Sequence, residues 1–134
     1  LNVRINDNFN RLRDEALNGN KLRTNKLLSD TIIDDDKNIF YLSIINQRLN
    51  KLSEVVGESE NLEKSISELK PPIFWKEKIN FLKQAKKWNT SKIKTILKKT
   101  YNLEIVIKSN SMINKNILMK KLLVDICESA MLRK

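Results

Sequence analysis

The chain has 134 residues, of which 40% are hydrophobic and 31% are charged, and its formal net charge is +10. This length suits one domain, and the composition favours a globular fold over a disordered tail. No apolar run approaches the roughly 18 residues of a membrane span, and the N-terminal residues lack a signal-peptide pattern. We therefore expect a cytoplasmic protein without a membrane partner, and the initial Leu1 suggests a piece of a longer chain.

The residue pattern predicts an all-α fold, a single helical domain of about six or seven helices over residues 1–134. Only two glycines interrupt the helix-compatible stretches, and no window alternates apolar and polar residues with period two. Apolar residues recur at helical spacing instead, and Gly19 is expected to end the first helix. The expected helices are about Asp7–Asn18, Lys21–Ser29, Lys37–Val56, Asn61–Leu69, Ile73–Trp88, Lys92–Lys108 and Ile113–Leu132.

Three features predict where helices begin. The acidic residues 34–36 favour the N-terminus of the third helix, where the helix dipole attracts carboxylates. Pro72 suits the first turn of the fifth helix, where its missing N–H costs nothing, and Pro71 favours an extended approach. Thr90 or Ser91 is expected to cap the sixth helix.

The last helix is apolar over much of its circumference, which predicts a central position or a role in an interface. We expect it to contribute both core and subunit contacts through Ile117, Leu118, Leu122, Ile126 and Met131.

The residue types argue against catalysis. The chain has no histidine, which removes the usual general base and most zinc sites. Cys127 lies among apolar residues, as expected for a packed core thiol, and two isolated glycines cannot form a phosphate loop. We therefore expect no catalytic residues, no metal and no cofactor.

The positive charge is concentrated in the second half of the chain. Residues 1–68 carry 10 Lys/Arg and 12 Asp/Glu, a net charge of −2, whereas residues 69–134 carry 16 and 4, a net charge of +12. Such a basic half indicates either a surface that faces phosphates or an acidic partner, or simply a lysine-rich solvated surface.

The basic half begins at the stretch PPIFWKEK, residues 71–78. Neighbouring helical residues point about 100° apart, so Phe74 and Trp75 cannot both face the core and one should lie near the surface. An exposed ring beside Lys76 and Lys78 suits nucleic acid, because a base can stack on the ring while lysines contact the backbone. In the alternative, one ring is core and the other packs against the proline turn.

Several segments, in this order, resemble the C-terminal collar domain of the delta subunit of the bacterial DNA polymerase III clamp loader. They are FNRLRDEALNGN at 9–20, IFYLSIINQRLNKL at 39–52, PPIFWKEK at 71–78, LEIVIK at 103–108 and LLVDICES at 122–129. The turn SNSMINKN at 109–116 departs from many relatives, which have a glycine there.

The resemblance implies an oligomerisation module rather than an enzyme. Its partners would be the gamma/tau and delta-prime subunits, joined in a five-membered ring, and the sliding clamp would be engaged only by a domain N-terminal to the collar. The delta collar lies close to primer–template DNA in related assemblies, which would give Phe74, Trp75, Lys76 and Lys78 a DNA-binding role. The alternative function is an autonomous basic helical protein that binds nucleic acid without a ring.

Overall fold

The computed structural model describes residues 2–57, 61–109 and 112–132, with side chains from Asn8 onward. These residues form seven α-helices and two short 3-10 turns, so the predicted all-α fold is confirmed. In chain order they are α1 (Asn2–Leu17), α2 (Lys21–Asp30), η1 (Asp35–Lys37), α3 (Asn38–Val56), α4 (Leu62–Ser67), η2 (Trp75–Glu77), α5 (Lys78–Lys87), α6 (Thr90–Ser109) and α7 (Lys115–Met131).

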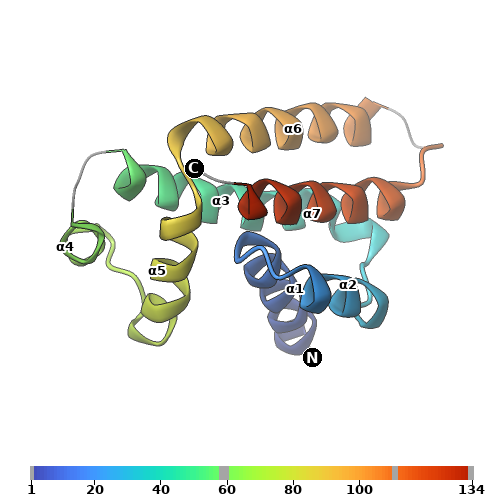
Figure 1. The fold of residues 1–134 in the computed structure, drawn as a ribbon. Coiled ribbons are helices and arrows are strands. Elements are labelled where there is room, and N and C mark those ends of the chain that lie inside the picture. The colour runs from blue at the N-terminus through green and yellow to red at the C-terminus, as the bar shows by residue number, and fades with distance from the viewer. Residues whose placement is uncertain (1, 58–60, 110–111, 133–134) are drawn as a thin grey trace.

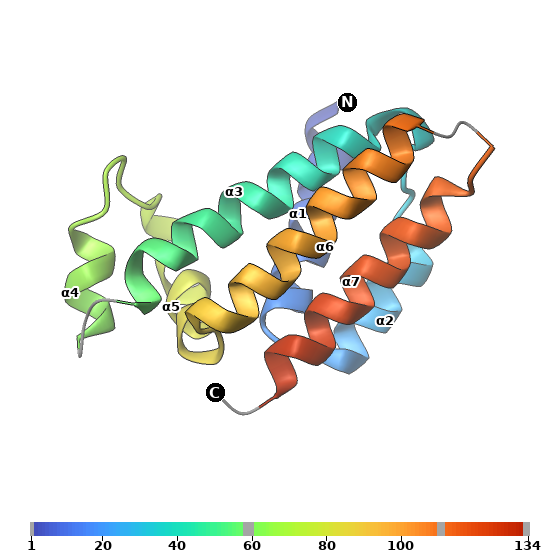
Figure 2. The same ribbon diagram turned by 90° about the horizontal axis from the view of Figure 1, so that it is seen from above.

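The helices are arranged in layers. The long helix α6 lies along one side of the molecule and packs against α3 and α7 (Figure 1). On the other side of α7, the pair α1 and α2 closes the core. The short helices α4 and α5 gather at one end, where α5 leads directly into α6 (Figure 2). This end of the molecule carries the basic stretch at residues 71–78.

The core is built from the apolar stripes that the sequence predicts. On α3, for example, Leu42, Ile45, Leu49 and Leu52 are all fully buried, and their spacing of three or four residues places them on one face. Cys127 is also buried, as predicted for a core thiol.

Trp88 is the largest fully buried side chain and joins two parts of the chain that are far apart in sequence. It follows the last residue of α5, and its indole Nε1–H donates a hydrogen bond of 2.9 Å to the carbonyl oxygen of Leu17. The last carbonyl groups of a helix have no N–H donor in the next turn, and this bond supplies one to the carbonyl of Leu17 at the end of α1. Trp88 therefore belongs to the core.

The turn at Gly19 and the cap at Asp34 follow the expected chemistry, whereas the cap of α6 does not. Gly19 has a φ of 72°, and a Cβ there would lie 3.2 Å from that of Ala130, so a glycine suits this turn on both counts. Asp34 caps η1 by accepting a hydrogen bond of 2.9 Å from the amide of Asp36. The prediction that Thr90 or Ser91 caps α6 is wrong, because Asn89 accepts the hydrogen bond from the amide of Lys92 at 2.8 Å.

Candidate nucleic-acid interface

The basic aromatic segment, residues 71–78, connects α4 to α5 at one end of the molecule (Figure 1). Phe74 and Trp75 are 55% and 69% exposed, and their ring centroids lie 5.9 Å apart with 56° between the ring planes. The Lys76 ammonium lies 5.3 Å from the centroid of the Trp75 ring, and Lys78 is exposed. All four predicted DNA-binding residues are therefore exposed, and three of them, Phe74, Trp75 and Lys76, lie close together as two rings beside a positive charge.

Two details of this segment differ from the prediction. No helix begins at Ile73, because residues 72–74 lie outside any helix, η2 begins at Trp75 and α5 at Lys78. The prediction that Pro72 occupies a first helical turn is therefore wrong. The prediction that Phe74 and Trp75 do not both face the core holds, but the alternative in which one ring is core is wrong, because both rings are exposed and Ile73 packs against the core instead.

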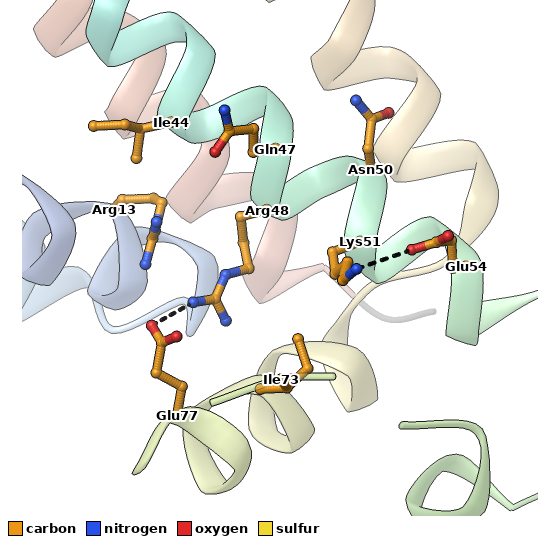
Figure 3. Close-up of a pocket in the computed structure, with 9 residues that line it drawn as sticks. All are labelled: Arg13, Ile44, Gln47, Arg48, Asn50, Lys51, Glu54, Ile73 and Glu77. Atoms are coloured by element: carbon orange, nitrogen blue, oxygen red, sulfur yellow. Dashed lines mark hydrogen bonds and ion pairs between the residues drawn. The ribbon is translucent and has the colours of Figure 1, made fainter. Parts of the chain in front are cut away.

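Glu77 fixes the segment to α3. Its Oε1 accepts a hydrogen bond of 2.9 Å from Nη2 of Arg48, as Figure 3 shows. Its backbone amide also donates a hydrogen bond of 2.8 Å to the carbonyl oxygen of Phe74, which closes the turn η2. With Ile73 packed inward and Glu77 paired to α3, the rings at positions 74 and 75 are left facing outward.

Arg48 belongs to a buried polar network that joins α1, α3 and α5. Its side chain is only 8% exposed, and Nη1–H donates a hydrogen bond of 3.4 Å to Oε1 of Gln84. The Gln84 amide donates in turn to Oδ1 of Asp14 at 3.1 Å, and Arg13 donates to the same oxygen at 2.8 Å. The guanidinium carbon of Arg48 also lies 5.4 Å from the centroid of the Phe81 ring.

The buried charge of Arg48 is compensated by its carboxylate partners. Burial lowers the pKa of its guanidinium, and the neighbouring charge of Arg13 lowers it further, whereas Asp14 and Glu77 oppose the shift. Removing a carboxylate would leave a poorly compensated cation in the interior, which is costly. The network therefore ties Glu77, and with it the basic aromatic segment, to α3.

A pocket of about 650 Å³ opens between α3 and the basic aromatic segment (Figure 3). Three cations and two carboxylates are among its lining residues, so their charges nearly balance, and Lys51 pairs with Glu54 at 3.9 Å. Because the charges nearly balance, we interpret the pocket as a polar contact surface between α3 and the segment rather than as a strong anion-binding site. The lining residues are Arg13, Ile44, Gln47, Arg48, Asn50, Lys51, Glu54, Ile73 and Glu77.

The structure divides the predicted subunit interface on α7 between surface and core. Ile117 and Met131 are exposed and Leu118 is half-buried, whereas Leu122 and Ile126 are buried within the chain. Only the first three can meet a partner without opening the core. The role of α7 in subunit contact stays a prediction.

The sequence reasoning missed the support beneath the segment, although a signal was present. Arg48 lies three residues after Ile45 and four before Leu52, so it falls on the buried stripe of α3. Gln84 lies in the same way between Phe81 and Trp88. A charged or amide side chain inside an apolar stripe indicates a buried polar partner, because burying such a group alone is costly.

Comparison with protein families, with curated proteins and with solved structures finds no match to this chain. Across residues 2–57, 61–109 and 112–132, no helix combines the length and the apolar character that crossing a membrane requires.

Replacing Arg48 by alanine is expected to lower the free energy of unfolding by about 2–4 kcal/mol, measured by urea denaturation. Removing one partner of a buried ion pair costs about 3–5 kcal/mol, and the lower range applies because the side chain of Glu77 is 44% exposed. The matched control is Arg23→Ala, which breaks the more exposed pair with Glu15 and should cost about 1 kcal/mol or less. Equal losses in the two variants would contradict a supporting role for Arg48.

Proposed function

We propose that this chain is a non-catalytic helical module, the collar of a DNA polymerase III clamp-loader delta subunit, and that it contacts primer–template DNA through the basic aromatic segment. In this role it joins gamma/tau and delta-prime subunits through its helices and serves the loading of the sliding clamp. The collar assignment is supported by the order of the five resembling segments along the chain.

The DNA contact rests on one observation: two aromatic rings are exposed together on a supported turn that also carries lysines. Adjoining apolar side chains on a surface are typical of a contact site, and Phe74 and Trp75 adjoin while 55% and 69% exposed. Stacking on unpaired bases uses such a ring directly, and the adjacent charge of Lys76 suits the phosphate backbone. The ion pair between Glu77 and Arg48 holds the turn in place before DNA arrives, which lowers the cost of binding.

A second candidate is an autonomous nucleic-acid-binding protein. It is favoured by the net charge of +12 on residues 69–134, which exceeds what one short segment needs for phosphate contact. In this case DNA would be bound strongly without any partner subunit.

A coprecipitation experiment separates the two candidates. The tagged chain is mixed with purified collar fragments of gamma/tau and delta-prime, and separately with fluorescent primer–template DNA. A collar module should retain the two fragments and bind the DNA weakly by itself, with affinity falling as salt rises. Strong DNA binding without retention of either fragment would support the autonomous protein. If the chain neither retains the fragments nor binds DNA, both candidate functions are contradicted.

A further inference from the structure

We propose that the nucleic-acid contact extends from the basic aromatic segment along α5 into a second, lysine-lined groove that binds the phosphates of a single strand. The inference rests on the proposed function, because the strand is the one whose base stacks on the exposed rings. It assigns a backbone-binding role to Lys83, Lys86 and Lys87.

The groove lies between α5 and the turn that joins α1 to α2. Its volume is about 440 Å³, and its lining residues are Glu15, Asn18, Asn20, Lys83, Lys86 and Lys87. Asn18 Nδ2 donates a hydrogen bond of 3.1 Å to Oδ1 of Asn80, which ties the two walls together. Asn20 also lines this wall, and its Oδ1 accepts a hydrogen bond of 3.2 Å from the amide of Arg23.

The charge of the groove is positive. Its one carboxylate, Glu15, is already paired with Nε of Arg23 at 3.1 Å. Within the part of the chain that the structure describes, neither Lys83 nor Lys86 forms an ion pair, and both are exposed. Lys87 donates to the carbonyl oxygen of Asn18, which keeps its ammonium at the groove. Phosphate oxygens are the complementary partner for such a wall.

The groove lies on the helix that directly follows the aromatic segment. On α5, Ile79 and Lys83 are four residues apart, and Lys86 and Lys87 come three and four residues after Lys83, so these four lie along one side of the helix. Trp75 lies in the turn η2 that leads into this helix. Ile79 is exposed between the ring and the first lysine and offers an apolar contact to a base or sugar. The 10 residues of α5 extend about 15 Å, so lysines along this helix and the rings before it can contact neighbouring nucleotides of one strand.

A single strand fits these features better than a duplex or an acidic protein. The rings at the start of the track need unpaired bases, because bases inside a duplex are already stacked. The lysines then follow the backbone in one direction, as in other proteins that track a single strand.

The salt dependence of DNA binding tests the groove. The chain is titrated with a fluorescein-labelled primer–template junction that carries a single-stranded overhang, and anisotropy gives the affinity at several salt concentrations. The triple variant Lys83→Gln, Lys86→Gln, Lys87→Gln should lower the slope of log affinity against log salt by about 2, at about 0.7 for each lost contact. The double variant Lys83→Gln, Lys86→Gln keeps the bond of Lys87 to Asn18 and should lower the slope by about 1.4.

The control removes the same charge elsewhere, with Lys94→Gln, Lys98→Gln and Lys120→Gln on the exposed faces of α6 and α7. It should leave the slope nearly unchanged, and an equal reduction would overturn the groove in favour of a general effect of net charge.

Trp75→Ala should weaken binding without changing the slope. If binding depends on Trp75 but not on the three groove lysines, the groove is wrong and the proposed function stands; if the chain binds no DNA at low salt, the DNA contact fails with it.

Discussion

Replacing Trp75 by alanine is expected to weaken binding to primer–template DNA by about 5- to 140-fold and to leave the melting temperature nearly unchanged. The affinity loss corresponds to about 1–3 kcal/mol for one stacked base. Stability should hold because the ring is 69% exposed and makes its close contacts with Phe74 and Lys76 at the surface. Anisotropy titration and thermal unfolding measure the two effects on the same protein.

Phe74→Ala provides the comparison, because the second ring is 55% exposed and should also be dispensable for stability. The variant that loses more affinity identifies the ring on which the base stacks. A large drop in melting temperature for both variants, with unchanged DNA binding, would show that the rings serve the fold instead.

Replacing Trp88 by alanine should have the opposite effect, lowering the free energy of unfolding by about 4–6 kcal/mol. Truncating a buried aromatic side chain costs about 3–5 kcal/mol, and the carbonyl of Leu17 loses the donor that it bonds at 2.9 Å. Small domains have only about 5–15 kcal/mol of stability, so this variant should be partly unfolded at body temperature. Urea denaturation followed by circular dichroism checks the loss.

Trp88→Phe separates the two contributions, because it keeps an aromatic ring and removes the indole N–H. It should cost less, about 1–3 kcal/mol. A loss for Trp88→Ala no larger than that for Trp75→Ala would contradict the central place of Trp88 in the core.

The fold could be predicted from the sequence because helical spacing and stop signals are local. The stripe of Ile45, Leu49 and Leu52 and the glycine at position 19 need no knowledge of the rest of the chain. The predicted cap of α6 differs from the observed one by one or two residues because asparagine, threonine and serine stand side by side at 89–91, and all three residue types can cap.

The conformation of the basic aromatic segment depends on tertiary contacts and could not be predicted in the same way. Helix propensity alone allows a helix from Ile73. Packing of the Ile73 side chain and the ion pair between Glu77 and Arg48 instead stabilise a non-helical stretch at 72–74, followed by the turn η2. The partner of Glu77 is 29 residues away in sequence, and nothing near position 77 indicates it. The sequence did indicate that this stretch is unusual, since it combines both prolines with adjacent aromatic residues.

The most direct test of nucleic-acid binding at this segment is the tryptophan fluorescence of the chain during titration with primer–template DNA at low salt. The chain has two tryptophans, of which Trp88 is fully buried and Trp75 is 69% exposed, so a base that stacks at the segment should quench Trp75 alone. We predict saturable quenching in the unmodified chain and none in Trp75→Phe, where only Trp88 emits. Unchanged emission at saturating DNA, or equal quenching in both proteins, would contradict stacking on Trp75.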